Sequence, residues 1–234
     1  MNMNHYTTTK TDNGFEILKN GVIIKTPLGK DLCVPSEGLA NAVSEELSEH
    51  CKKITSVEDY KAAMAKMPMF RMAMGAIDIV SERKDEIIEE LVSKIDNDII
   101  CYRSDNNNEL EELENENWNP CVEWFNKRFD SFLAVKHGIS FIEQSNSLKE
   151  RLRKYLHSLS PFVLSGISQC VSDTDSLIIS LMLFEKEIDH EKAFKLSVLE
   201  EEWQTSKWGK DILVRKKHEE LKSDLALCAR FISV

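Results

Sequence analysis

The feature that most constrains the fold is a change of pattern near residue 38. Before it, short apolar runs alternate with turn residues, and this stretch holds half of the eight glycines and two of the five prolines. After it, apolar residues recur at helical spacing to the end of the chain. Glycine and proline interrupt helices but suit tight turns. We therefore predict an α+β protein, with a small β domain at residues 1–38 followed by a larger, mostly α-helical bundle domain at residues 39–234.

The β domain is expected to contain a hairpin. Asn20 and Gly21 stand between two apolar runs, and both residues tolerate the positive φ that a two-residue turn requires. Pro27 and Gly29 indicate a second turn. The expected strands are FEIL (15–18), VIIK (22–25) and DLCV (31–34).

Apolar stripes predict helices over most of the remaining chain. Ser36 opens the first of them, because serine before an apolar stripe is a favoured N-cap. The expected buried faces are Leu39, Val43 and Leu47; Met69, Met72, Ala76, Ile79 and Val80; Ile87, Ile88, Leu91, Val92 and Ile95; and Leu221, Leu225, Cys228 and Ile232.

Proline indicates two further helix starts. Asn119-Pro120 and Ser160-Pro161 each place a capping residue before a proline at the first helical position. The run SLIISLMLF (176–184) is apolar all round, which is typical of a helix buried on every side, and it is too short to cross a bilayer. The acidic stretch at 104–117 could be an exposed helix or a disordered loop, and we expect a solvated surface segment.

Composition excludes several classes of partner. The net charge of −10, from 40 acidic and 30 basic residues, repels phosphate backbones and anionic lipid, so we expect no nucleic acid and no membrane insertion. The start MNMNHYTTTKTDNG has neither an apolar signal core nor the arginines of a mitochondrial presequence, so a cytoplasmic location of the bacterial type is expected. The six scattered cysteines form no CxxC pair and are expected to be buried thiols in a reducing compartment.

The sequence contains no convincing catalytic motif. It lacks the glycine-rich phosphate loops and the GxSxG nucleophile turn. His190 and His218 each precede a glutamate, but neither has the second histidine of an HExxH zinc helix. The carboxylates at 200–202 would point about 100° apart on a helix, so they cannot form an acid–base pair, although one of them could contact a cationic partner group. We therefore predict no enzyme, no metal and no cofactor.

The four tryptophans gather at two expected helix boundaries. Trp118 and Trp124 lie in WNPCVEW, whereas Trp203 and Trp208 flank QTSK just before Gly209. Glycine after an apolar residue is typical of a helix end. Tryptophans in such places are either packing anchors or interface residues, and we favour packing.

These segments, in this order, resemble one family over nearly the whole chain. The family comprises the assembly chaperones for the alpha subunit of the F1 head of ATP synthase, found in mitochondria and related bacteria. The matching segments are NGVIIKTPLGKDLCVPSEGLANAVSEE, MPMFRMAMGAID (67–78), DIICYR (98–103), WNPCVEW (118–124), SLIISL (176–181), EEWQTSKWGKD (201–211) and ARF (229–231). The resemblance implies a small β domain before a helical domain, and a protein, monomeric when free, that binds the free alpha subunit without catalysis before that subunit meets beta.

The resemblance also implies functional positions. In the E-x-x-Q-x-x-x-W-G motif and just after it, the partner-binding residues would be Glu201, Gln204, Trp208, Gly209 and Asp211. Matching positions with structural or partner-binding roles are Arg71, Asp78, Asp98, Tyr102, Arg103, Trp118, Pro120 and Trp124. The chain departs from the usual family residues at Val22 (arginine), Leu47 (tryptophan) and Phe70 (a small polar residue).

Two other classes stay open on sequence grounds. A general holdase or scaffold of broader client range would suppress aggregation of unrelated proteins. An enzyme with an unrecognised site in a cleft between the β and helical parts would be stabilised by some metabolite.

Overall fold

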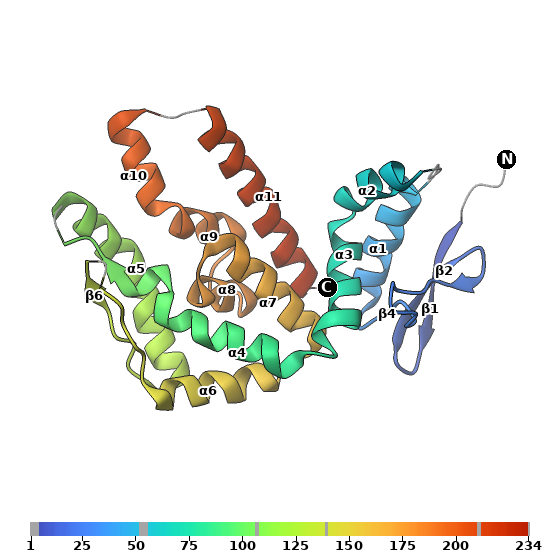
Figure 1. Ribbon diagram of the computed structural model, residues 1–234, viewed down its shortest axis with the longest axis horizontal. Helices are drawn as coiled ribbons and strands as arrows, with labels where there is room; N and C mark the ends of the chain where they lie inside the picture. Colours follow the sequence, from blue (N-terminus) through green and yellow to red (C-terminus); the bar gives the residue numbers. More distant parts are fainter. Residues whose placement is uncertain (1–4, 52–55, 106–107, 139, 210–211, 234) are drawn as a thin grey trace. The chain divides into compact units, whose positions relative to one another are not determined.

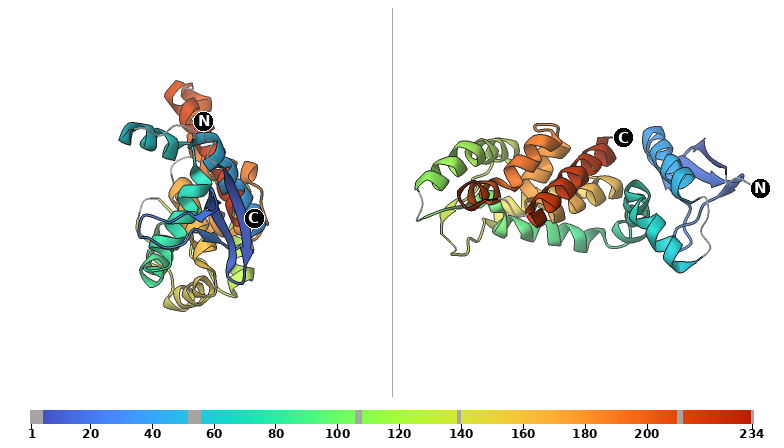
Figure 2. Two further views of the ribbon diagram at one scale, coloured as in Figure 1. Left: turned by 90° about the vertical axis from the view of Figure 1, so that its right-hand side faces the viewer. Right: turned by 90° about the horizontal axis from the view of Figure 1, so that it is seen from above.

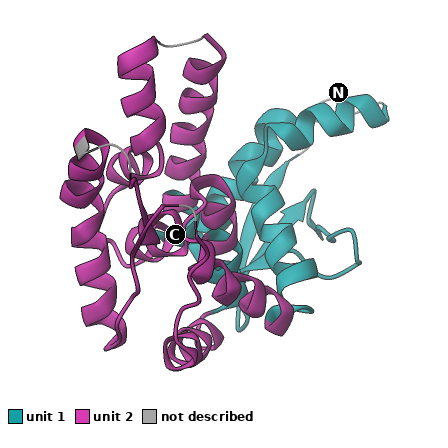
Figure 3. Ribbon diagram, turned by 60° about the vertical axis from the view of Figure 1, so that its left-hand side comes forward, with its two compact units in different colours: residues 1–84, 160–166, 230–234 teal, residues 85–159, 167–229 magenta. Residues whose placement is uncertain are grey.

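The computed structural model describes residues 5–51, 56–105, 108–138, 140–209 and 212–233. Its backbone contacts form two compact units, drawn in teal and magenta in Figure 3. Unit 1 comprises residues 1–84, 160–166 and 230–234, and unit 2 comprises residues 85–159 and 167–229. Strand gives way to helix at Glu37, next to the predicted boundary at residue 38. The division into domains 1–38 and 39–234 stays a prediction, because it separates strands from helices whereas the two units group residues by contact.

Unit 1 is built around an antiparallel sheet whose central strand is β2 (Gly14–Lys19). This strand pairs with β1 (Tyr6–Thr11), β3 (Val22–Ile23) and β4 (Cys33–Val34). Asn20 and Gly21 have φ of 53° and 81°, which confirms the predicted hairpin between β2 and β3. Helix α1 (Glu37–His50) packs against the sheet, as Figures 1 and 2 show.

Strand β1 was not predicted, although the sequence carries its signal. Asp12, Asn13 and Gly14 are turn residues between the threonine-rich run of β1 and the apolar run of β2. Threonine is β-branched and favours strands even where apolar alternation is weak. Gly14 has φ of 133°, and a Cβ at this position would lie 2.4 Å from the carbonyl oxygen of Val34, so only glycine fits.

The helices of unit 1 begin with different caps. Ser36 Oγ accepts a hydrogen bond from Leu39 N, which confirms the predicted N-cap of α1. Helix α2 (Val57–Ala65) has a serine capping box. Helix α3 (Pro68–Gly75) has no side-chain cap of its own, and the carboxylate of Glu46 on α1 accepts from the amides of Met69 and Phe70 instead. This contact fixes α3 against α1.

The predicted apolar face from Met69 to Val80 is wrong at Ile79, which is exposed. The reason is a π-helical turn, η1 (Ala76–Val80), that directly follows α3. A π turn adds a residue to the helical repeat and so rotates the side chains that follow it. Asp78 is turned inward, where it accepts hydrogen bonds from Thr26 Oγ1 (2.6 Å) and Leu28 N (3.1 Å). The turn therefore buries a capping carboxylate in place of the isoleucine.

The three residues that depart from the family pattern differ in burial. Val22 is exposed at the start of β3, whereas Leu47 and Phe70 are buried in unit 1. The exposed position changes the surface, and the buried ones belong to the packing.

Unit 2 is mostly helical. Two 3₁₀ turns, η2 (Ile95–Asn97) and η3 (Ile99–Cys101), lead into β5 (Tyr102–Arg103), which pairs in parallel with β6 (Lys136–His137). The helices that lie mostly in unit 2 are α4 (Lys84–Lys94), α5 (Asn108–Phe129), α6 (Asn146–His157), α7 (Pro161–Thr174), α8 (Leu177–Phe184), α9 (His190–Ser197), α10 (Leu199–Trp208) and α11 (Ile212–Ser233). The first residues of α7, up to 166, and the last residues of α11, from 230, belong to unit 1. In the described ranges, no helix combines the length and the apolar character that crossing a membrane requires.

Two further helix predictions are confirmed. Helix α8 is buried from Leu177 to Leu183, as expected for the run that is apolar all round. The helix at Pro161 begins as predicted, and Ser160 Oγ accepts from Val163 N. The six cysteines are free thiols, four of them buried.

The prediction that Pro120 starts a helix is wrong. It lies inside α5, which begins at Asn108, so most of the acidic stretch is helical. The buried positions Leu110, Glu114, Trp118, Cys121, Phe125 and Phe129 follow helical spacing on both sides of the proline. Burying this stripe offsets the cost of an internal proline, about 3 kcal/mol.

Candidate functional site

Helices α10 and α11 carry the candidate site, and a single carboxylate joins them. Lys217 Nζ on α11 donates to Glu201 Oε1 on α10 at 2.7 Å. His218 Nε2, on the next residue, lies 2.9 Å from Glu201 Oε2. The two hydrogen bonds lower the pKa of Glu201, Lys217 contributing most, so the carboxylate is ionised at neutral pH. Glu201 therefore holds α10 against α11 within unit 2.

Helices α10 and α11 also contain two buried nitrogen atoms without a hydrogen-bond partner. The His218 ring is buried and lies edge-on to Phe194, with ring centroids 5.5 Å apart. Its Nδ1 has no hydrogen-bond partner, and neither has Trp203 Nε1. Over the part of the chain that the structure describes, these are the two buried side-chain nitrogen or oxygen atoms left unpaired. Such an atom costs about 1–3 kcal/mol, so each one requires an explanation.

The three consecutive glutamates of α10 face different surroundings. Glu201 turns to α11, Glu200 lines a pocket of about 460 Å³, and Glu202 lines a second pocket of about 400 Å³ beside Phe194 and Arg215. They do not converge as an acid–base pair, in agreement with the helical geometry. Their place in the first turn of α10 is favoured by the helix dipole.

The C-terminal end of α10 is the exposed part of the motif. Gly209, with φ of 92°, ends the helix as predicted, and its N–H donates to Thr205 O. Trp208 is 76% exposed and lies edge-on to the half-buried Trp203, with ring centroids 6.0 Å apart. Gln204 is also exposed. Asp211, the last predicted partner-binding residue, lies outside the described residues.

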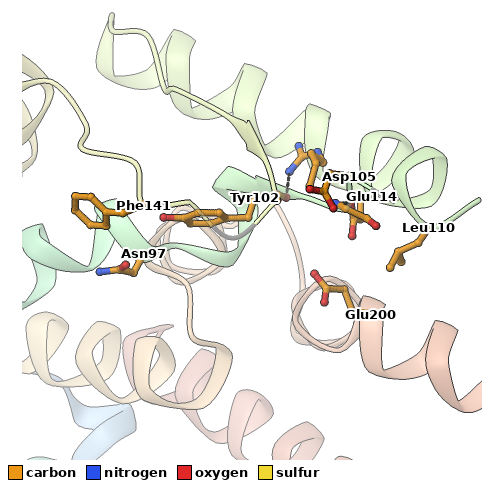
Figure 4. Close-up of a pocket in the computed structure, with 10 residues that line it drawn as sticks. Asn97, Tyr102, Asp105, Leu110, Glu114, Phe141 and Glu200 are labelled. Carbon is orange, nitrogen blue, oxygen red and sulfur yellow. Dashed lines mark hydrogen bonds between the residues drawn. The ribbon is translucent and has the colours of Figure 1, made fainter. Parts of the chain in front are cut away.

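Figure 4 shows the 460 Å³ pocket, with Glu200 across from Glu114 and Asp105. Burial raises the pKa of Glu114, and the nearby Glu200 raises it further, against the hydrogen bond from Ser104 N. Although Glu200 as a residue is exposed, desolvation of its carboxylate raises its pKa as well. Carboxylates that face one pocket favour a cationic group over an anionic one.

The side chains of Arg103 and Trp118 are buried rather than exposed on the surface. Arg103 Nη1 donates to the carbonyls of Ile100 and Tyr102, and its Nε and Nη2 donate to Asn115 and Asn119. Trp118 is 1% exposed, and its Nε1 donates to Leu196 O at 3.1 Å. The guanidinium carbon of Arg103 lies 5.3 Å from the Trp118 ring centroid. These two residues fasten α5 to its neighbours.

Asp98 is fully buried and caps two elements. It accepts from Ile100 N at the start of η3, and from Ser176 Oγ (2.7 Å) and Ile178 N (3.0 Å) at the start of α8. Burial raises the pKa of Asp98 to about 6, and these hydrogen bonds act against that rise. Tyr102 OH donates to the carbonyl of Asp96 at 2.7 Å. The side chains of Asp98 and Tyr102 therefore form hydrogen bonds within the protein.

The four remaining predicted residues are scattered. Asp78 lies in η1 and accepts hydrogen bonds from Thr26 and Leu28 in unit 1. Arg71 is exposed, and no described residue forms a side-chain hydrogen bond or ion pair with it. On α5, Pro120 is exposed and Trp124 is half-buried. The structure therefore gathers two groups of predicted residues: Glu201, Gln204, Trp208 and Gly209 on α10, and Asp98, Tyr102, Arg103 and Trp118 around η3 and α5.

Sequence reasoning missed Lys217 and His218 as partners of Glu201. A signal existed, because two helices that fold back at a glycine bring together residues equidistant from it. Glu201 is eight positions before Gly209, and Lys217 is eight positions after it. In the described part of the chain, no group of three or more histidine, cysteine, aspartate or glutamate residues is placed to hold a metal ion.

Comparisons with known proteins place this chain among the chaperones. Residues 3–126, more than half of the chain, match the ATP12 chaperone protein family. The chain is 31% identical to the mitochondrial protein atp12 of Schizosaccharomyces pombe, over 95% of this chain and 79% of that protein. It resembles the crystal structure of Atp12 from Paracoccus denitrificans with a TM-score of 0.86 at 27% identity, covering 97% and 94% of the two chains.

A structure of a mutant of the same Paracoccus protein gives a TM-score of 0.88, with the same identity and coverage. The chain belongs to the ATP12 chaperone family. The family resemblance drawn from the sequence motifs is confirmed, and so is the α+β fold class.

Proposed function

We propose that this chain is an F1 assembly chaperone that binds the free alpha subunit of ATP synthase, protects it until it pairs with the beta subunit, and catalyses no reaction. Membership of the ATP12 chaperone family supports the general role. The E-x-x-Q-x-x-x-W-G motif of α10, carried by Glu201, Gln204, Trp208 and Gly209, supports the choice of client through its resemblance to the alpha-subunit chaperones.

The observation that favours α10 and α11 as the binding surface is their incomplete bonding. Both unpaired buried nitrogens of the described chain, in Trp203 and His218, belong to these helices, and Trp208 next to them is exposed. Buried polar groups in native proteins are rarely left without partners, so two on one pair of helices single these helices out. A surface that a partner covers would account for the exposed Trp208.

The chemistry of the task agrees with such a surface. A subunit without its partner exposes a large apolar interface that is prone to aggregate. A chaperone that must release its client needs contacts of moderate strength, some of them polar. Helices joined by a half-exposed ion pair, with one exposed tryptophan, meet that requirement.

The test is co-expression of the tagged chain with the cognate alpha and beta subunits separately, followed by pull-down. We expect recovery and solubilisation of alpha but not of beta. If alpha is soluble and folded yet is not retained, the proposal is wrong. If unrelated aggregating proteins are protected equally well, the chain is a general holdase.

A variant pair links this test to α10. Glu201→Lys sets an ammonium against Lys217 and His218, so we expect it to reduce the recovery of alpha. Glu123→Lys on α5 is the matched control, because Glu123 is exposed and forms no ion pair with a described residue. Far-UV circular dichroism of both variants should match the unsubstituted protein, which separates lost binding from lost folding.

A further inference from the structure

Three large apolar side chains are exposed where α10 ends and α11 begins. Trp208 is 76% exposed, Ile212 81% and Leu213 74%. Trp208 and Ile212 are four positions apart, so their Cα atoms lie within about 14 Å whatever the path between them. We call these three residues the hairpin-end patch. Exposed apolar patches with polar residues around them are typical of interaction sites.

Basic residues flank the hairpin-end patch in the sequence. Lys207 lies at the end of α10, and Arg215, Lys216 and Lys217 lie in the first two turns of α11, all of them exposed. They stand out in a chain whose net charge is −10. Lys207, Lys216 and Lys217 pair with glutamates, whereas Arg215 forms no ion pair with any described residue.

We propose that the hairpin-end patch docks a client segment in which apolar side chains alternate with or adjoin aspartate or glutamate. This inference rests on the proposed function, since the segment belongs to the client. The apolar side chains of the segment cover Trp208, Ile212 and Leu213, and its carboxylates meet Arg215 and Lys216. Glu201 is a positioning residue, which holds α11 in place through Lys217 and His218.

A lipid surface is the competing occupant, because tryptophan with lysine and arginine also suits an anionic membrane interface. The net charge of −10 repels such a surface as a whole, whereas an acidic protein segment can reach the basic patch alone. The charge pattern therefore favours a protein partner.

The first experiment removes the apolar side chains. A variant with Trp208→Ser, Ile212→Ser and Leu213→Ser is compared with Phe132→Ser, a control whose side chain is 77% exposed outside α10 and α11. In co-expression with alpha, we expect the triple variant to lower the affinity about tenfold or more, with no change for the control. If the triple variant retains alpha as well as the unsubstituted protein, the inference is wrong while the proposed function stands. If the unsubstituted protein retains no alpha, the proposed function fails first.

The second experiment tests the charge and the lipid alternative. Arg215→Glu with Lys216→Glu should weaken alpha binding and reduce its dependence on salt, whereas Lys127→Glu with Lys195→Glu, at exposed sites elsewhere in unit 2, should not. Equal binding by both pairs contradicts the acidic segment. Co-sedimentation with phosphatidylcholine–phosphatidylserine vesicles that is lost in the triple variant would assign the patch to lipid and overturn the proposal.

Discussion

Two regions of unit 2 contain the same kinds of residue and use them in opposite ways. In the η3–α5 cluster, formed by Asp98, Arg103 and Trp118, all three side chains are buried and hydrogen-bonded inside the protein. In the α10–α11 hairpin, Trp203 and His218 each keep an unpaired nitrogen, and the end of α10 exposes Trp208. A tryptophan near a charged residue therefore indicates neither role by itself. The state of its hydrogen bonds distinguishes the two.

The energetics of the two regions differ accordingly. Breaking a buried, fully bonded charge network costs several kcal/mol, because one partner is left buried and uncompensated. The ion pair of the hairpin is half-exposed, and such pairs contribute only about 0–1 kcal/mol. We therefore expect the η3–α5 cluster to contribute more to the stability of unit 2 than the α10–α11 hairpin. The α10–α11 hairpin should open more easily by local unfolding.

The largest predicted effect is in the cluster. Trp118→Ala should reduce the free energy of unfolding by about 3–5 kcal/mol, because it removes a fully buried aromatic ring and leaves a cavity. Urea unfolding followed by circular dichroism measures this loss. Trp124→Ala, on the same helix but half-buried, is the control and should cost less. Equal losses would show that burial does not decide which tryptophan anchors α5.

The second prediction concerns pH and Asp98. Its pKa is about 6 in the folded protein and about 3.9 when unfolded, so the folded state binds the proton more tightly. The contribution of Asp98 to the free energy of unfolding is therefore highest below about pH 4 and constant above about pH 6. Between these values it falls as pH rises, by at most about 1.4 kcal/mol per pH unit.

Asp98→Asn isolates this contribution. The difference in unfolding free energy between the unsubstituted protein and the variant, measured by denaturant between pH 4 and pH 7, should change over that window and then level off. The variant should also lose about 1–3 kcal/mol, because an amide cannot accept all the hydrogen bonds that the carboxylate accepts. A difference that does not vary with pH would contradict the raised pKa.

Much of the fold could be predicted from the sequence because its signals are local. The hairpin at Asn20-Gly21, the cap at Ser36 and the all-apolar helix α8 each depend on neighbours within a few residues. The errors arose where packing outweighed local preference. At Pro120 a buried stripe carries α5 through a proline, and at Ile79 a π turn changes the face of the helix. Neither effect is visible in a local window.

The candidate site was less predictable. The end of α10 at Gly209 follows from the sequence, and helix spacing explains why the glutamates at 200–202 point apart. The equal spacing of Glu201 and Lys217 from Gly209 is a signal for their contact, but which side chains meet depends on how the two helices pack. Unpaired nitrogens are harder still to foresee, since they depend on every atom around them.

The third prediction sharpens the contrast within the hairpin. Glu201→Gln should lower the unfolding free energy by only about 0.5–1 kcal/mol, since the pair is half-exposed. Because its folded pKa is lowered, the contribution is complete above the usual glutamate value of about 4.3 and disappears as pH falls through the lower folded value. Denaturant unfolding at pH 7 and pH 3 measures it, with Glu123→Gln as control. A loss as large as that of Trp118→Ala would mean that the hairpin is part of the core.

The smallest effect on stability is expected at Trp208. Trp208→Ser should change the unfolding free energy by less than about 0.5 kcal/mol, because an exposed side chain loses little when it is removed. The same substitution should remove most of the tryptophan fluorescence that acrylamide quenches, since Trp118 is buried and Trp124 and Trp203 are half-buried. If the hairpin binds a client, adding the alpha subunit should protect the fluorescence of the unsubstituted chain from acrylamide and leave the Trp208→Ser variant unchanged. Equal protection in both would move the client surface away from α10 and remove the contrast between the two regions.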